Sequence, residues 1–120
     1  MVFTNTGRQI TRNLLSGGSQ AYLQYGAVGI GSAVASGTDT TLGSEVIRKA
    51  FEEVDDTTDY ETTYETYLSS VQATGLSLRE IGLCTASSGG SVAFRSTFTA
   101  LAKTTGNEVL IEYKAKSEEG

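Results

Sequence analysis

The sequence predicts a mainly β fold, either an antiparallel β-sandwich or a partly closed barrel, with a short N-terminal α-helix. The 120 residues include 14 glycines and no proline, a composition that favours short strands joined by tight turns. Several segments alternate apolar and polar side chains, and turn residues separate them at hairpin spacing. At this length we expect one domain over 1–120, made of a helical part (1–18), a β-sandwich (19–116) and a polar tail (117–120).

A β-hairpin lies at the centre of the predicted fold. Its first arm begins at Arg79 and its second arm ends at Arg95. The turn over 87–90, with sequence SSGG, joins the arms, because glycine readily takes the positive φ angles that tight turns need. Charged residues stand inside both of the otherwise buried-looking arms, Glu80 in the first and Arg95 in the second. We expect these two residues to form an ion pair that fixes the strand register or to bridge two subunits.

The N-terminal helix is predicted from a capping residue and an apolar stripe. Asn5 or Thr6 can cap its start, and the segment 16–18, with sequence SGG, ends it. A helix of about two to three turns is marginal alone in water, so it must dock on another element. Arg8 and Arg12 lie one turn apart beside the stripe, and they face either solvent or a neighbouring subunit. The stripe consists of Ile10, Leu14 and Leu15.

About six strands are predicted after the helix. Gly26 and Gly29, inside the first of them, mark a bulge or a close backbone approach. The segment 32–44 is predicted to be a surface loop with a brief helical turn over 39–42. Residues 45–53 alternate as a strand does, with a short helix as the alternative. The predicted strands span 21–30, 45–53, 60–71, 76–85, 92–99 and 109–114.

Half of the acidic residues fall in one segment. Seven of the 14 Asp and Glu residues lie between Glu52 and Glu65, and no Lys or Arg occurs over 50–78. A solvated acidic turn is the simplest interpretation, and packing against a positive surface of a neighbouring subunit is the alternative. Calcium binding is a further interpretation, but the spacing is not that of an EF-hand loop. No metal site is therefore predicted. The residues that calcium would use are Asp55, Asp56 and Asp59.

Tyrosines recur at alternate positions in the predicted strand 60–71. Tyr60 and Tyr64 share a face with three further residues of β-forming or apolar type. We interpret this face as a packed sheet surface, because a platform that stacks bases or sugars would need exposed aromatic rings beside basic residues. The absence of tryptophan also counts against a carbohydrate-binding module, which we keep as a less favoured alternative.

Catalytic chemistry is not predicted. The chain has no histidine and one cysteine, Cys84, which stands in a predicted strand where a small buried hydrophobe fits better than a nucleophile. A dinucleotide-binding loop is also excluded, because Val34 stands where the pattern that begins at Gly29 needs a third glycine. The sequence therefore predicts neither an enzyme nor a cofactor.

Charge and hydropathy bear on partners and compartment. The formal net charge of −5 argues against a nucleic-acid-binding surface. A single cysteine cannot form an internal disulfide, so folding in a reducing cytoplasm is expected. The start of the chain lacks the features of a signal peptide, and no run approaches the roughly 18 apolar residues of a membrane span. Neither secretion nor membrane insertion is therefore predicted.

Several short, non-catalytic motifs follow one another along nearly the whole chain. In order, they are Asn5–Gly7, Ala27–Gly31, Asp39–Leu42, Glu45–Val46 with Arg48, Arg79–Leu83, and Ala93–Arg95 continuing through Phe98 to Lys103–Thr104. This order resembles that of small virion proteins of tailed phages. It is similar in particular to the N-terminal attachment domains of tail-collar and tail-fibre proteins.

The resemblance implies a multivalent structural role in a virion that is assembled in the host cytoplasm. The expected role is fibre attachment or an adaptor function in the tail or baseplate. The implied partners are tail, baseplate or major capsid proteins, and the chain itself is expected to form a homo-oligomer, with a trimer favoured. Fibre proteins continue into a long shaft, whereas this sequence stops after the domain, so a capsid decoration protein of the cement or turret kind is the alternative. The candidates for subunit-interface or structural ion pairs are Arg8, Arg12, Arg48, Arg79, Glu80 and Arg95.

Overall fold

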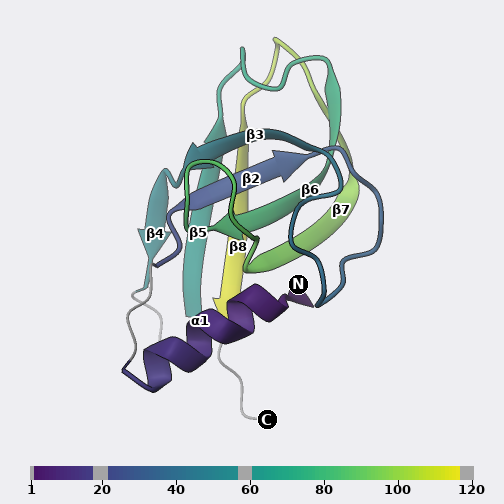
Figure 1. The fold of residues 1–120 in the computed structure, drawn as a ribbon. Coiled ribbons are helices and arrows are strands. Elements are labelled where there is room, and N and C mark those ends of the chain that lie inside the picture. Colours follow the sequence, from purple (N-terminus) through teal and green to yellow (C-terminus); the bar gives the residue numbers. More distant parts are fainter. Residues whose placement is uncertain (1, 18–21, 57–60, 117–120) are drawn as a thin grey trace.

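The computed structural model describes residues 2–17, 22–56 and 61–116, and in these ranges the chain is mainly β (Figure 1). Eight strands of the described part form two antiparallel sheets, and the described part also contains one helix. The predicted fold class is confirmed, and the sheets are compatible with a sandwich because they do not close into a barrel. No helix in these ranges is long and apolar enough to cross a membrane. The elements are β1 Val2–Phe3, α1 Asn5–Leu15, β2 Tyr25–Gly29, β3 Glu45–Ala50, β4 Glu53–Asp55, β5 Glu61–Leu68, β6 Leu76–Cys84, β7 Phe94–Lys103 and β8 Val109–Lys116.

The two sheets combine local hairpins with distant strand pairs. The first sheet has the order β1-β7-β6-β2-β3, and the second has the order β4-β5-β8. Consecutive strands pair in β2–β3, β4–β5 and β6–β7, but β2 also pairs with β6, and β5 pairs with β8. The fold is therefore not the simple succession of hairpins that we predicted. The chain passes repeatedly between the layers, which lets each sheet bury one face against the other.

The central hairpin forms, as predicted, between β6 and β7. Gly82 lies opposite Arg95, and the register shifts between Leu78 and Glu80. The connection over 85–93 is longer than the predicted turn, because regular pairing begins again only at β7. Two glycines of this connection have positive φ angles, as predicted: Gly89 and Gly90.

Apolar side chains cover both faces of β6. One face contributes to the core between the sheets, and the other lies under the loops that follow β2 and β6, which explains why the run from Glu80 to Cys84 is entirely buried. Two clusters lie between the sheets. One contains Val28, Leu68, Leu78 and Val109, and the other contains Ile81, Leu83 and Tyr113. The cluster on the loop side contains Ala27, Leu42, Cys84 and Val92.

The sheets approach each other closely where β2 faces β5. A Cβ atom added at Gly26 would lie 1.9 Å from the Oγ1 atom of Thr66, so the backbone of β2 can take this position only with glycine. The register of β2 against β3 also shifts between Val28 and Gly29. Both predicted features of the glycines in this strand, a close approach and a bulge, are therefore present.

The start of α1 differs from the prediction. The N-cap is Thr4, and its Oγ1 accepts a hydrogen bond from the N–H of Gly7 at 3.2 Å, so Asn5 and Thr6 lie inside the helix. The Thr4 hydroxyl also lies 2.9 Å from the carbonyl oxygen of Ala93. Because Thr4 is completely buried by this contact with the segment before β7, the tertiary structure selects the cap rather than the local sequence alone.

Several predicted boundaries are also wrong. The short strands β1 and β4 were not predicted, and β2 begins at Tyr25 rather than at residue 21. The helical turn predicted over 39–42 does not form, because Asp39 and Thr40 bond instead to Arg95 and Val92. Residues 45–50 form a strand, so the helical alternative is excluded. The tail 117–120 and the predicted start of the strand at Tyr60 fall outside the described residues.

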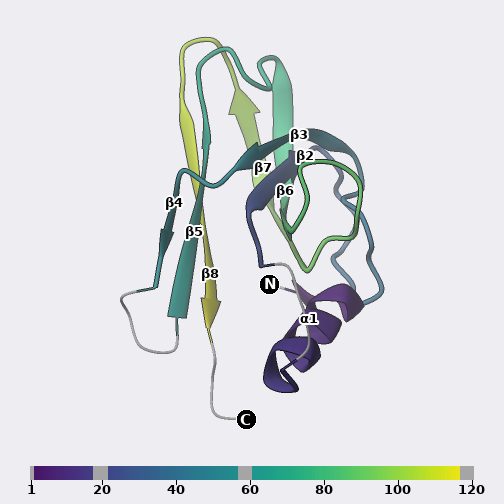
Figure 2. The ribbon, with the colours of Figure 1, turned by 60° about the vertical axis from the view of Figure 1, so that its left-hand side comes forward.

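The helix α1 lies across one end of the sandwich, beside the ends of the two sheets (Figures 1 and 2). Ile10 is partly buried, but Leu14 and Leu15 are 61% and 85% exposed. Only part of the predicted apolar stripe therefore packs on the sandwich. The rest of it remains on the surface of the chain.

Candidate functional site

Glu80 lies on β6 and is completely buried under the loop between β2 and β3. Its Oε2 accepts hydrogen bonds from the backbone N–H groups of Gly31 and Ser44 at 2.6 and 2.8 Å, and its Oε1 accepts one from Gly43 at 2.7 Å. Burial disfavours the charged carboxylate, but these three donors and Arg95 outweigh burial and lower the pKa of Glu80. The carboxylate is therefore held ionised inside the fold.

Arg95 reaches the same carboxylate from β7, and its side chain is only 2% exposed. Its Nε and Nη2 lie 3.1 and 3.0 Å from Oε1 of Glu80. Its Nη1 donates to Oδ2 of Asp39 at 3.0 Å, and its Nη2 donates to the carbonyl oxygen of Ala33 at 2.9 Å. Every nitrogen of the guanidinium group therefore has an acceptor.

We call Glu80, Arg95 and Asp39 together the loop clamp. It joins the hairpin β6–β7 to the loop between β2 and β3 through the buried side chains of Glu80 and Arg95, the partly buried Asp39 and backbone donors of the loop. Buried charges of this kind are tolerated only when they are paired and hydrogen-bonded, and these are. The chemistry of the loop clamp is structural, because its charged groups are occupied by one another and by the loop backbone.

Arg48 on β3 holds the other long connection, between β6 and β7. Its Nη1 donates to the carbonyl oxygens of Ala86 and Gly89 at 3.0 and 2.8 Å. Its Nη2 and Nε donate to the carboxylate of Glu45 at 2.7 and 3.2 Å, and this hydrogen bonding raises the pKa of Arg48. Arg48 thus makes an ion pair within the chain and fixes a loop.

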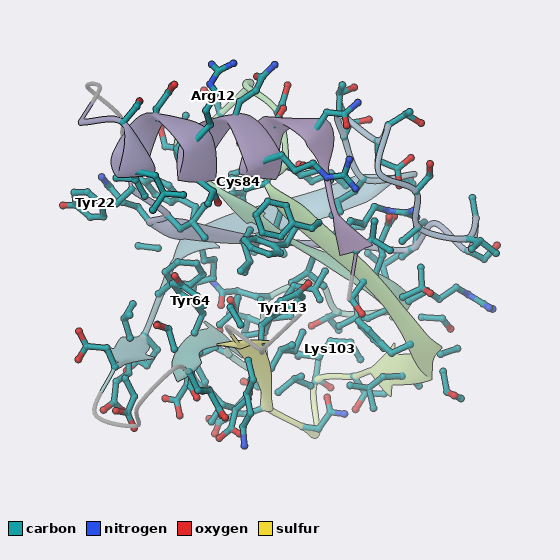
Figure 3. The ribbon with its side chains drawn as sticks, turned by 90° about the horizontal axis from the view of Figure 1, so that it is seen from below. Arg12, Tyr22, Tyr64, Cys84, Lys103 and Tyr113 are labelled. Carbon is teal, nitrogen blue, oxygen red and sulfur yellow. The ribbon has the colours of Figure 1, made fainter. Side chains whose placement is uncertain are left out.

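The other predicted arginines lie on the surface. Arg8, Arg12 and Arg79 are all exposed. Arg12 donates to Oδ1 of its neighbour Asn13 at 3.1 and 3.3 Å, and it lies on the side of α1 that points away from the sandwich (Figure 3). Within the described ranges, no carboxylate forms a salt bridge with any of these three arginines.

The acidic segment supplies the edge strand β4 and the start of β5. Glu53 lies opposite Glu65, and Glu65 lies opposite Glu112, so three carboxylates stand side by side across the second sheet. We call them the carboxylate row. Partial burial and the neighbouring charges of Glu53 and Glu112 raise the pKa of Glu65. The calcium alternative depends in part on Asp59, which is outside the described residues; the described residues contain no group of three ligands that could hold a metal ion.

Cys84 is buried and has a free thiol. Burial raises its pKa to about 11, although Arg48 acts in the opposite direction. The thiolate is the nucleophilic form, so this cysteine is unreactive near neutral pH. Its neighbours in the loop-side cluster are apolar. Cys84 therefore behaves as the small hydrophobe that its sequence position predicts.

Two tyrosines of the second sheet, Tyr64 and Tyr113, pack inside the sandwich. The ring centroid of Tyr64 lies 4.8 Å from that of Phe51, and the ring centroid of Tyr113 lies 6.1 Å from that of Phe94. Burial raises the pKa of both phenol groups. This face of β5 is therefore a packed sheet surface, as predicted, although Tyr60 itself is outside the described residues.

An apolar groove of about 210 Å³ opens between α1 and the end of the sandwich. Figure 3 looks onto this end, with Tyr22 near the helix and with Tyr64 and Tyr113 between the helix and the second sheet. The groove is partly open to solvent, and its walls are more apolar than polar. The large apolar residues that line it are Ile10, Leu14, Tyr22, Leu23, Tyr64 and Phe94.

Sequence reasoning missed three polar residues that hold the fold together. Asp39 completes the loop clamp, but nothing distinguishes it locally from any other loop aspartate. Lys49 donates from Nζ to the carbonyl oxygen of Tyr67 and to Oε1 of Gln72, both at 2.8 Å. Lys103 is buried at the end of β7, and its Nζ donates to the carbonyl oxygen of Thr104 at 3.2 Å. Its place in a largely uncharged strand is the one signal that sequence offered.

The loop clamp, the exposed face of α1 and the carboxylate row are the features that bear on function. The first is internal and structural, whereas the other two lie on the surface. Comparison of the chain with protein-family models, with curated proteins and with solved structures finds no match.

Proposed function

We propose that this chain is a non-enzymatic structural protein of a tailed-virus particle, a fibre-attachment or adaptor component of the tail or baseplate. In this proposal the chain is assembled into virions in the host cytoplasm. Its partners are other virion proteins and further copies of itself, with a trimer favoured. The proposal needs no cofactor, nucleic acid or membrane.

The observation that best supports the proposal is how its motifs meet in space. Four motifs of the resemblance to tail-collar and tail-fibre attachment domains contribute to the loop clamp. Gly31 ends one motif, Asp39 begins the next, and Glu80 and Arg95 lie in two later motifs. Motifs that are far apart in sequence thus depend on one another through a single buried unit. In this proposal, the order of the motifs follows from a shared architecture rather than from a shared chemistry.

The distribution of exposed groups also supports an assembly role. The exposed leucines of α1 lie at one end of the molecule, next to arginines that have no carboxylate partner among the described residues. Exposed apolar groups beside unpaired charges are typical of surfaces that meet another protein. A capsid decoration protein needs the same kind of surface, so it remains the alternative, and the neighbours of the chain in a particle distinguish the two roles.

Purified virus particles test the proposal. Density-gradient fractions from cultures that produce the virus encoding this chain should contain it in a fixed ratio to a tail or baseplate protein, as measured by quantitative mass spectrometry. Immunogold labelling at the tail would support the proposal, and regular labelling of the capsid would support decoration instead. A chain that is abundant in infected cells but missing from particles would overturn both roles. A host cytoplasmic enzyme serves as the negative control.

A further inference from the structure

We infer that the outer face of α1 in one copy of this chain binds the outer face of the second sheet, over the carboxylate row, in another copy. This inference rests on the proposed function, in which copies lie together in a particle, and it names the two surfaces that meet. The occupant of the helix face is therefore a second copy of the same chain.

The outer face of α1 carries a basic and apolar stripe. Arg8, Arg12 and Leu15 are spaced as i, i+4 and i+7, so they lie on one side of the helix. All three are exposed, and Leu15 is 85% exposed. Figure 3 shows Arg12 on the side of α1 that faces away from the sandwich. The helix contains no Asp or Glu, so its own side chains do not neutralise this stripe.

The outer face of the second sheet carries the complementary groups. Directly opposed residues of an antiparallel sheet point to the same face, and Thr66 and Leu68 on β5 point inward, so the carboxylate row points outward. Leu110 lies two residues from Glu112 on the same face and is 50% exposed. An apolar side chain therefore flanks one end of the row.

The spacing of the two surfaces matches. Arg8 and Arg12 are about 6 Å apart along the helix axis, and neighbouring carboxylates of the row are about 5 Å apart across the strands. Leu110 lies about 7 Å along its strand from the end of the row, within reach of Leu15 when the helix crosses the sheet diagonally. Two arginines can thus contact the row while the two leucines touch.

The charges also favour this contact energetically. Like charges placed directly opposite each other destabilise a sheet, and burial together with the charges of Glu53 and Glu112 raises the pKa of Glu65. Two guanidinium groups from a neighbouring copy would relieve the repulsion between these charges. The contact joins two different surfaces, and such contacts close into rings when the rotation between copies permits. This geometry fits the ring-symmetric copies that the proposed function requires.

A charge-swap experiment tests the inference. Sedimentation velocity would be measured for the full chain, for the variant R8E/R12E and for the variant E53K/E112K. In the second variant lysines flank Glu65 on both sides, which replaces repulsive cross-strand pairs by attractive ones and so favours folding. We expect the unmodified chain to associate and each variant alone to associate at least about tenfold more weakly, a change of about 1.4 kcal/mol. An equimolar mixture of the two variants should associate again, because each supplies the surface that the other has lost.

Matched controls show whether the chosen residues act specifically. R79E reverses an exposed arginine on β6, away from both surfaces, and should associate like the unmodified chain. Leu15→Ser should weaken association, whereas Val71→Ser, at another exposed apolar residue, should not. Circular dichroism establishes that each variant is folded before its association is compared.

Three results would overturn the inference: an unmodified chain that stays monomeric, variants that associate as strongly as the unmodified chain, or a mixture of folded variants that fails to associate. These outcomes are separable from the proposed function. A chain that is found in particles but stays monomeric in solution leaves the proposed function standing and removes the helix-to-sheet contact. A chain that associates through this contact but is missing from particles leaves the helix-to-sheet contact standing and removes the proposed function.

Discussion

Arg95 on β7 approaches Glu80 on β6 through two nitrogens that end on the same carboxylate oxygen. Its Nε and Nη2 lie 3.1 and 3.0 Å from Oε1. The other oxygen, Oε2, accepts hydrogen bonds from the backbone N–H groups of Gly31 and Ser44. One carboxylate thus joins the hairpin to the loop between β2 and β3, so the hairpin and the loop are stabilised together.

Removing the guanidinium group should strongly destabilise the fold. Arg95→Ala leaves Glu80 buried without its cation, and breaking a buried pair in this way costs about 3–5 kcal/mol. Urea unfolding followed by circular dichroism measures the change. Arg79→Ala, which removes an exposed arginine from the neighbouring strand, is the control and should change stability by less than about 0.5 kcal/mol. Equal unfolding midpoints for the two variants would show that the loop clamp contributes nothing.

The stability that Glu80 contributes should depend on pH. The pKa of Glu80 is lowered in the folded chain, so the folded state binds fewer protons than the unfolded state. Its contribution is therefore complete above the unfolded value of about 4.3 and is lost as the pH falls through the lower, folded pKa. Glu80→Gln should be less stable than the unmodified chain at pH 7, and the difference should shrink below about pH 4. Urea unfolding from pH 3 to 7 tests this; a constant difference would contradict it.

The close contact between the sheets should make Gly26 sensitive to substitution. In Gly26→Ala the new Cβ would lie 1.9 Å from Oγ1 of the buried Thr66, so the sheets must move apart, and overpacking of this kind costs about 1–3 kcal/mol. Gly106→Ala is the control, because the nearest atom to its Cβ would be 3.6 Å away. Adding Thr66→Ala to Gly26→Ala should restore part of the loss in a double-mutant cycle. Full additivity of the two changes would contradict the contact.

Neutralising the middle of the carboxylate row should stabilise the chain. Glu65→Gln removes the charge that repels Glu53 and Glu112, so the thermal unfolding midpoint should rise at pH 7. The pKa of Glu65 is raised in the folded state, so its ionisation destabilises the fold only as the pH rises through that range. At about pH 3, well below the unfolded value of about 4.3, the group is protonated in both states, so the variant and the unmodified chain should melt together. Asp56→Asn controls for the loss of one exposed carboxylate. An equal rise of the thermal unfolding midpoint in that variant would show that repulsion within the carboxylate row is not the cause.

The fold class could be predicted because alternation and glycine placement act locally. The strand β8 shows this well: Val109 and Tyr113 are buried, whereas Leu110 and Glu112 are exposed, as a period of two requires. The pairing of β2 with β6 and of β5 with β8 could not be predicted, because it depends on how distant faces fit together. Thr4 illustrates the same limit for the helix cap, since carbonyl groups close to 90 residues away in sequence help to place it.

The loop clamp could be predicted only in part. Glu80 and Arg95 stand out because a charge in an apolar strand needs a partner. Asp39 and the backbone N–H groups of the loop have no such signal, because their role arises from a loop that folds back over β6. The carboxylate row could not be predicted either, because Glu112 lies beside Glu65 only when β5 is paired with β8.

Cross-linking of intact, gradient-purified virus particles, followed by mass spectrometry, tests the central claim most directly. A structural subunit of the tail or baseplate should be cross-linked both to its own copies and to a neighbouring tail or baseplate protein. The result that would contradict the claim is a chain that forms no cross-link to any virion protein and is recovered only from the soluble fraction of lysed cells.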